Sequence, residues 1–214
     1  MLAPVRHLMR RAHAPVYAAR LRALTRAIGP HLEPGDRVLD VGCGVGTLGE
    51  ALLGDPDRPE GLAVEGLERH ARGGEPIPVT PYGGGRFPFD DGSFDVVVVA
   101  DVLHHDHEPG AVLDECRRVS RRLVIVKDHV LRGPLARARV SLIDWAANAP
   151  HGVPCLFRYN TLSEWRRVPG AHGLRTVEER ASMDLYPPGV NLFFGGKLQY
   201  LAVYSVNGSG ERGA

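Results

Sequence analysis

Short apolar runs alternate with segments of helical periodicity along most of the chain. The runs have the length and composition of buried strands, and they lie at Arg37–Val41, Gly61–Leu67, Ile77–Val79, Phe94–Ala100, Leu123–Val126, Arg175–Ala181 and Gln199–Val206. Helical patterns fall between them at Thr47–Leu53, Pro109–Arg118, Leu135–Asn148 and around Ser163–Arg167. This alternation predicts an α/β fold with a mostly parallel sheet. Because residues 69–85 are rich in glycine and proline, we expect one sheet edge to be short and covered by loops.

The first 32 residues have a pattern of their own. Val16, Leu21, Leu24 and Ile28 recur at roughly helical spacing, and six arginines precede the first acidic residue, Glu33. We therefore predict an N-terminal helical cap or lid over residues 1–32, a main domain over 33–207 and a flexible tail over 208–214. We expect the helix to pack on the domain with its arginines in solvent, and contact with an anionic membrane is the alternative that the pattern does not favour.

Composition narrows the class of protein. The 214 residues are 43% hydrophobic and 24% charged, which is typical of one globular domain, and the net charge of +1 gives no reason to expect nucleic acid as a partner. The three cysteines are far apart and indicate free thiols in a reducing compartment. No apolar run approaches the roughly 18 residues of a membrane span, and no signal-peptide pattern is present. We expect a cytoplasmic protein.

A glycine-rich loop joins the first predicted strand to the first helix after it. Gly42, Gly44 and Gly46 permit positive φ angles and let a ligand lie directly against the backbone. In nucleotide-binding folds of this kind, an acidic residue about 20 positions further on accepts the ribose hydroxyls. Glu68, at the end of the second strand, fits this role, and Glu65 is the competing candidate.

These segments resemble the class I S-adenosylmethionine-dependent methyltransferases, specifically small bacterial type 11-like members. Val38–Gly46 looks like motif I of that superfamily, and Phe87–Val97 followed by Asp101–His105 resembles its second characteristic stretch. The resemblance covers roughly Arg37–Lys127. It implies a Rossmann-like, doubly wound, seven-stranded sheet that is mostly parallel with an antiparallel last strand, and S-adenosylmethionine as cofactor.

Carried over by position, the resemblance assigns the cofactor-binding residues. It places the methionine and ribose end of the cofactor at Asp40, Gly42, Cys43, Gly44 and Gly46, the ribose hydroxyls at Glu68, and the rest of the cofactor along Asp101 and Leu103. Many members of the superfamily also place an Asp where it accepts the adenine amino group. The corresponding segment here, Tyr82–Arg86, has no carboxylate, so adenine recognition would rest on backbone groups or on packing against Tyr82.

Histidines near the ends of the fourth and fifth strands are the candidate catalytic groups. A methyl donor of this kind is already activated, so a base is needed only where the acceptor must lose a proton. We expect His105 to be the base or to orient the substrate, with His104 and His129 as alternates, although a histidine here can simply pack beside the cofactor. The run His104–Glu108, joined by His129 and His151, is also compatible with a metal site, but we expect no metal.

The acceptor pocket is expected further along the chain. The candidate substrate-binding residues are Trp145, Asn148, His151 and Tyr159, whose aromatic members are equally compatible with a core role. We predict methyl transfer to oxygen or nitrogen of a small molecule. One alternative is a lipid or quinone C-methyltransferase whose N-terminal helix docks on the membrane, and another is a non-catalytic cofactor-binding partner protein. An NAD-dependent oxidoreductase fits the glycine spacing less well, and the oligomeric state is left open.

Overall fold

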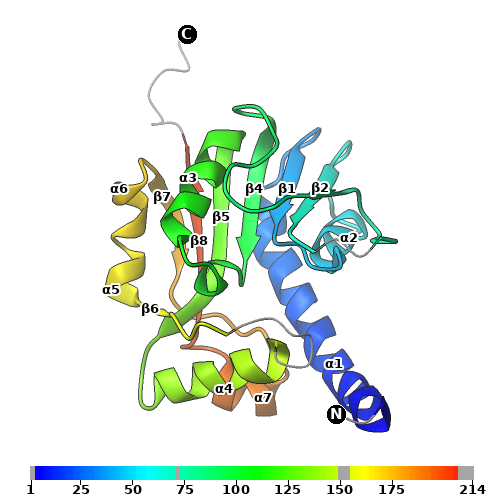
Figure 1. The fold of residues 1–214 in the computed structure, drawn as a ribbon, viewed down its shortest axis with the longest axis vertical. Coiled ribbons are helices and arrows are strands. Elements are labelled where there is room, and N and C mark those ends of the chain that lie inside the picture. Colours follow the sequence, from blue (N-terminus) through cyan, green and yellow to red (C-terminus); the bar gives the residue numbers. More distant parts are fainter. Residues whose placement is uncertain (1–2, 71–72, 149–154, 207–214) are drawn as a thin grey trace.

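A computed structural model describes residues 3–70, 73–148 and 155–206, with side chains from residue 15 onward (Figure 1). The predicted tail at 208–214 and the candidate residue His151 lie outside the described residues. The core of the fold is a sheet of seven strands in the order β3-β2-β1-β4-β5-β8-β7, with a two-residue strand, β6 (Asn160–Thr161), paired to β5. Their bounds are β1 (Arg37–Val41), β2 (Ala63–Glu68), β3 (Val79–Pro81), β4 (Phe94–Ala100), β5 (Ser120–Leu131), β7 (Arg175–Arg180) and β8 (Gln199–Ser205).

The strand directions confirm the predicted topology. β1, β2, β3, β4 and β5 pair in parallel, whereas β8 is antiparallel to both β5 and β7. Parallel neighbours require crossover connections, and α2 (Thr47–Leu53, between β1 and β2) and α3 (Pro109–Val119, between β4 and β5) lie in two of them. Consecutive valines of β4 pack on opposite faces of the sheet: Val97 and Val99 belong to one core cluster, and Val96 and Val98 to the other.

Helices surround the sheet on both faces and at its carboxyl edge (Figure 1). Their bounds are α1 (Ala3–Ile28), α2 (Thr47–Leu53), α3 (Pro109–Val119), α4 (Ala136–Asn148), α5 (Leu162–Trp165), α6 (Val168–Ala171) and α7 (Pro188–Phe194), with short 3₁₀ helices η1 (Gly29–His31) and η2 (Leu103–His105). The core on one face includes Leu113 and Trp165, and the core on the other includes Leu24 and Leu52. None of the helices in the described residues combines the length and apolarity needed to cross a bilayer.

The two halves of helix α1 lie in different parts of the molecule. Its last turns bury Leu24 and Ile28 against the sheet. The preceding turns extend past the carboxyl ends of the strands, toward the end of the molecule where α4 and α7 lie (Figure 1). The N-terminal segment is therefore helical, as predicted, and part of it borders the edge at which open α/β sheets bind ligands.

The predicted length of β5 is wrong. The sequence indicates a strand over Leu123–Val126, but β5 runs from Ser120 to Leu131. Its polar residues Lys127, Asp128 and His129 continue the strand because they pair with Leu201, Tyr200 and Gln199 of β8. His129 therefore lies within the strand and not after it. The segments α6, α7 and β6 were also not predicted, since each is short; α7 begins at a proline and α6 has one at its second residue.

Candidate active site

The glycine loop between β1 and α2 requires its glycines. Gly42, Gly44 and Gly46 have φ angles of +67°, +59° and +78°, which side chains with a Cβ rarely adopt. A Cβ on Gly42 would also lie 2.5 Å from a methyl group of Val102. The loop is fixed to β2 because the Gly42 N–H donates to the carbonyl oxygen of Leu67 at 2.7 Å. Among the described residues other than its chain neighbours, no heavy atom lies within 4 Å of a Cβ placed on Gly44, so the loop is open at that residue.

The structure separates the two glutamates that the sequence left as alternatives. Glu68 faces the glycine loop, where its Oε2 accepts a hydrogen bond from the Gly44 N–H at 2.8 Å. Glu65 lies further back along β2, where its Oε1 accepts from the hydroxyl of Thr80 at 2.7 Å. Only Glu68 is therefore in contact with the loop. Tyr82 follows close by, since its N–H donates to the Glu68 carbonyl oxygen and its ring packs edge-on against Phe87.

Asp40 supplies a buried carboxylate directly below the loop. Its Oδ2 is buried and has no hydrogen-bond partner among the described residues. Burial raises the pKa of Asp40 to about 7, although the positive charge of Arg20 acts in the opposite direction. An unpaired buried carboxylate oxygen costs free energy unless a ligand donates to it. Asp40 thus fits a binding site for a group carrying a positive charge or an N–H. Nearby, Cys43 packs against the backbone of Gly66.

Asp101, directly after β4, has a strained backbone conformation, and its side chain connects the end of β4 with α1 and β5. Its φ angle of +58° is unusual for a residue with a side chain. Its carboxylate accepts hydrogen bonds from Arg20 of α1 at 2.7 Å and from Lys127 of β5 at 2.5 Å. Burial alone would raise the pKa of Asp101, but these two cations hold it well below its usual range. The sequence did not identify Arg20 because its partner is 81 residues away.

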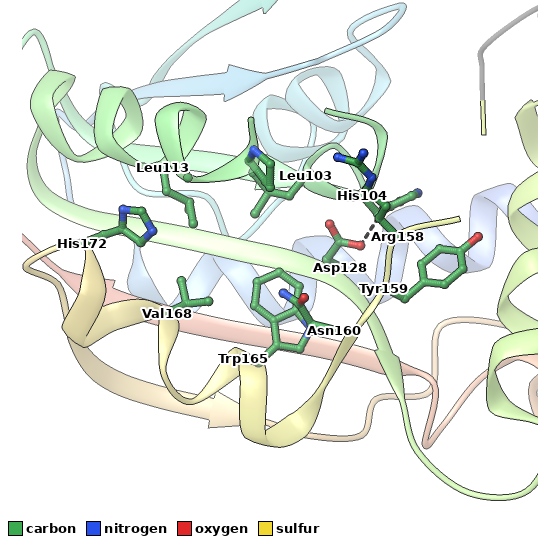
Figure 2. Close-up of a pocket in the computed structure, with 12 residues that line it drawn as sticks. Leu103, His104, Leu113, Asp128, Arg158, Tyr159, Asn160, Trp165, Val168 and His172 are labelled. Carbon is green, nitrogen blue, oxygen red and sulfur yellow. Dashed lines mark hydrogen bonds and ion pairs between the residues drawn. The ribbon is translucent and has the colours of Figure 1, made fainter. Parts of the chain in front are cut away.

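A buried histidine between two carboxylates forms the centre of the site. The Nδ1 atom of His104 lies 2.6 Å from Oδ1 of Asp128, the contact drawn in Figure 2, and its Nε2 lies 3.6 Å from Oδ1 of Asp144. Burial disfavours the charged imidazolium, yet the two carboxylates outweigh it and raise the pKa of His104 to about 10. His104 therefore carries a positive charge at neutral pH.

Asp144 of α4 contacts several of the predicted site residues that lie around His104. Its carboxylate accepts hydrogen bonds from Tyr159 at 2.5 Å and from Asn148 at 2.8 Å, and Nε2 of His105 lies 3.5 Å from it. Asn148 and Tyr159 are thus brought to the site through Asp144, which was not among the predicted site residues. The sequence signal that could have identified Asp144 is the spacing of an acidic residue and an amide four positions apart on one helix. Trp145 points elsewhere, with 56% of its surface exposed.

His129 lies in the same cluster but has different chemistry. Its Nε2 is 4.0 Å from Asp101, and its Nδ1 is buried without a hydrogen-bond partner in the described part of the chain. Burial, assisted by the positive charge of Lys127, lowers the pKa of His129 to about 4. His129 is therefore neutral at neutral pH. Two sets of side chains bring their ligand atoms within 4.8 Å of one another and can hold a metal ion: Asp101, His104 and His129, or His104, His105 and Asp144.

A pocket of about 180 Å³ opens beside His104 (Figure 2). Its polar wall includes His104, Asp128 and Tyr159, whereas Leu113 and Trp165 belong to its apolar wall. Leu103 of η2, the residue predicted to border the cofactor, also lines this pocket. Trp145 and Asn148 are not among the lining residues. An apolar cavity with a few convergent polar groups is typical of a small-molecule site.

The charge on His104 predicts a specific dependence of stability on pH. Because its pKa in the folded chain is about 10 against an ordinary value of 6.5, His104 stabilises the fold fully below pH 6.5 and loses this effect as the pH rises toward 10. The free energy of unfolding should fall by at most about 1.4 kcal/mol per pH unit in this range. The ionisable groups around it are Asp101, His105, Asp128, His129, Asp144 and Tyr159.

Urea unfolding at several pH values, compared with the His104→Gln variant, measures this effect. The variant should be less stable at pH 6.5, and its stability should change less between pH 6.5 and 10. Parallel pH profiles for the two proteins would contradict the assignment of a charged His104.

The comparisons with known proteins agree with this geometry. A model of the methyltransferase domain family matches residues 9–179. The chain belongs to the methyltransferase domain family. This confirms the predicted superfamily and enzyme class, and S-adenosylmethionine as the cofactor of this methyltransferase. The residues present fit that cofactor, since the loop is open at Gly44 and Asp40 offers an unpaired carboxylate oxygen.

Two curated proteins and one solved structure illustrate the range of relatives. A demethylmenaquinone methyltransferase of Clavibacter sepedonicus is 31% identical over 183 residues, which span 74% of this methyltransferase and 72% of the relative. A ubiquinone/menaquinone biosynthesis C-methyltransferase of Paraburkholderia phymatum is 28% identical over 72% of this chain and 70% of its own. A solved S-adenosylmethionine-dependent methyltransferase of Aquifex aeolicus shares the fold, with a TM-score of 0.60 at 16% identity over 94% of this chain and 98% of that one.

Proposed function

We propose that this methyltransferase transfers a methyl group to a ring carbon of a small hydroxylated aromatic acceptor bound beside His104. The observation that carries the proposal is the charged, buried His104 held between Asp128 and Asp144 at the wall of the pocket. A fixed positive charge in a poorly hydrated site stabilises a phenolate oxygen far better than water does. A phenolate in turn donates electron density to its ring carbons, which makes them nucleophilic.

The cofactor would lie along the glycine loop at the carboxyl ends of β1, β2 and β4. Glu68 would accept the ribose hydroxyls, and Asp40 and Asp101 would face the amino acid portion of the cofactor. When bound, S-adenosylmethionine supplies a methyl group already activated by its sulfonium. The chain's own task is to align the acceptor carbon with that methyl group and to exclude water. Helix α1 contributes a cover over the loop, since Tyr17 contacts Thr47 at 2.6 Å and Arg20 contacts Asp101.

His105 is the proposed base. Its ring is partly exposed, and its Nε2 lies 3.5 Å from the buried carboxylate of Asp144, which would stabilise the imidazolium formed when His105 takes the hydroxyl proton. His104 is unsuited to this step because it already carries a proton. His129 is also unsuited because its pKa of about 4 makes it a weak base. His105 would therefore remove the hydroxyl proton, and His104 would hold the resulting oxyanion. Transfer of the methyl group to the ring carbon would release S-adenosylhomocysteine. Loss of the hydrogen on that carbon and return of a proton to the oxygen would then restore the aromatic ring and its hydroxyl, with one proton released to solvent overall.

The choice of carbon as the methylated atom comes from the relatives. Both curated relatives carry names that refer to quinones, and the name of the Paraburkholderia relative specifies C-methylation. The same site can also deprotonate a hydroxyl for O-methylation, which is one of the two reactions predicted from the sequence. Carbon and oxygen products can be separated by counting exchangeable protons, because C-methylation of a dihydroxylated ring leaves both hydroxyls in place and O-methylation leaves one.

The test uses purified protein with S-adenosylmethionine and 1,4-naphthohydroquinone, kept reduced, with 1-naphthol as a second acceptor. The expected result is a singly methylated naphthohydroquinone that retains both exchangeable hydroxyl protons in mass spectrometry after deuterium exchange. A product with one exchangeable proton would replace the proposal with O-methylation. Tight cofactor binding without turnover of any ring acceptor would instead support the non-catalytic alternative.

A further inference from the structure

Helix α4 exposes an apolar stripe on the side opposite its buried face. Leu142 and Trp145 are 53% and 56% exposed, and Leu135, just before the helix, is exposed on the same helical spacing. The buried face of α4 consists of Ala136, Val140 and Asp144, which point toward the site. A helix of a small domain normally presents charged residues to solvent on its outer face. This stripe therefore needs a covering partner.

Helix α7 continues the apolar surface. Arg139 of α4 donates hydrogen bonds to the carbonyl oxygens of Phe193 and Leu192, at 2.6 and 3.3 Å, so the two helices lie side by side. Leu192 and Phe193 are both strongly exposed. In Figure 1 the pair forms the end of the molecule beyond the carboxyl edge of the sheet. We call the surface formed by Leu135, Leu142, Trp145, Leu192 and Phe193 the α4–α7 face.

Arginines lie around the α4–α7 face, together with one exposed carboxylate, Asp184, which accepts a hydrogen bond from Asn191 of α7. Arg132 and Arg137 are exposed at the start of α4, and the sole acidic residue of that helix, Asp144, is buried beneath it. Helix α7 has no charged residue of its own. An apolar surface bordered by arginines matches a bilayer that contains anionic lipids.

We propose that the α4–α7 face docks this methyltransferase on the surface of an anionic lipid bilayer. A second copy of the chain is a poorer partner, because pairing two such faces would bring arginine opposite arginine. Docking would place the carboxyl edge of the sheet, with the pocket beside His104, close to the lipid. The idea that the acceptor is itself lipid-borne rests on the proposed function, whereas bilayer binding does not.

The two tryptophans make this proposal directly measurable. Trp145 lies on the α4–α7 face, whereas Trp165 is 3% exposed and stacks on Tyr200 inside the core. Adding phosphatidylcholine–phosphatidylglycerol vesicles to the full chain should shift the fluorescence of Trp145 to shorter wavelength, and phosphatidylcholine vesicles should cause a much smaller shift. The Trp145→Phe variant should still sediment with anionic vesicles but lose the spectral shift.

Two charge variants and a matched control complete the test. Leu142→Glu and Phe193→Glu should each weaken co-sedimentation with anionic vesicles by about tenfold. Val177→Glu is the control, because Val177 on β7 is similarly exposed, at 59%, but lies outside the α4–α7 face. Cofactor binding by calorimetry confirms that each variant is folded.

The proposal is overturned if the wild-type chain does not bind anionic vesicles, or if all three glutamate variants bind as the wild type does. It is also overturned if sedimentation velocity shows a dimer that only Leu142→Glu or Phe193→Glu dissociates, since the face would then join two copies. Vesicle binding is measured without any acceptor. A failure to methylate 1,4-naphthohydroquinone would therefore leave this result standing.

Discussion

Replacing Glu68 with alanine is expected to weaken the binding of S-adenosylmethionine by about 100-fold, as measured by calorimetric titration. Hydrogen bonds to a charged group contribute roughly 1.5–3 kcal/mol each, and a ribose offers two hydroxyls to this carboxylate. The variant also removes the acceptor for the Gly44 N–H, which is 2.8 Å from Oε2 in the structure. Glu68→Gln should have a smaller effect because its amide oxygen can still accept one of these bonds.

Glu65→Gln is the control for this experiment. Glu65 is on the same strand and has a comparable environment, but its carboxylate is bonded to Thr80 and not to the glycine loop. Its cofactor affinity should stay close to that of the wild type. If Glu65→Gln lost affinity and Glu68→Ala did not, the cofactor would lie differently from the proposed position. Binding of NAD in place of S-adenosylmethionine is a further result that would contradict the site assignment.

Replacing His104 with glutamine is expected to lower the turnover rate by about 100- to 1000-fold with little change in cofactor affinity. Glutamine can still donate a hydrogen bond toward Asp128, but it carries no charge with which to stabilise a phenolate. The loss should therefore appear in kcat more than in the affinity for the acceptor, which depends on the apolar wall of the pocket. The measurement is steady-state kinetics with the naphthohydroquinone acceptor, alongside calorimetry with the cofactor.

His172→Gln is the matched control. His172 lines the same pocket, and its Nδ1 contacts a carboxylate, Asp114, at 2.7 Å, as His104 contacts Asp128. Asp114 is largely exposed, however, so the pair is weakly stabilised and its loss should change turnover by less than about fivefold. Equal losses in His104→Gln and His172→Gln would contradict a special role for the buried charge.

Tyr159→Phe is a smaller change to the contacts around His104, since it removes only the hydrogen bond from Tyr159 to Asp144.

The sequence predicted the strands whose residues are mainly apolar and missed the features that depend on distant partners. β1 and β4 occupy their predicted residues because apolar runs bounded by turns determine them locally. The extension of β5 through Lys127, Asp128 and His129 could not be predicted locally. A charged residue is stable in a central strand only where a partner is present, and the partners here, Asp101 and His104, come from a different part of the chain.

The same reason separates the predicted from the missed site residues. The glycine loop and Glu68 follow from a local strand–loop–helix pattern with a fixed spacing, so they could be named from sequence. Arg20 and Asp144 join the site only when α1 and α4 fold over the carboxyl edge of the sheet. Trp145 shows the opposite error: an aromatic residue next to Asp144 in sequence lies on the other side of the helix in space. Helical periodicity alone did not reveal which side faces the protein.

The position of β8 has a consequence for how the chain acquires its structure. β8 is the last strand in the described part of the chain, yet it lies between β5 and β7 and pairs with both. Until residues 199–205 leave the ribosome, β5 has an unpaired edge and β7 lacks the strand with which it pairs. Such edges are templates for wrong pairing with other chains. A nascent chain that stalls before residue 199 is therefore expected to depend on chaperones more than the finished protein does.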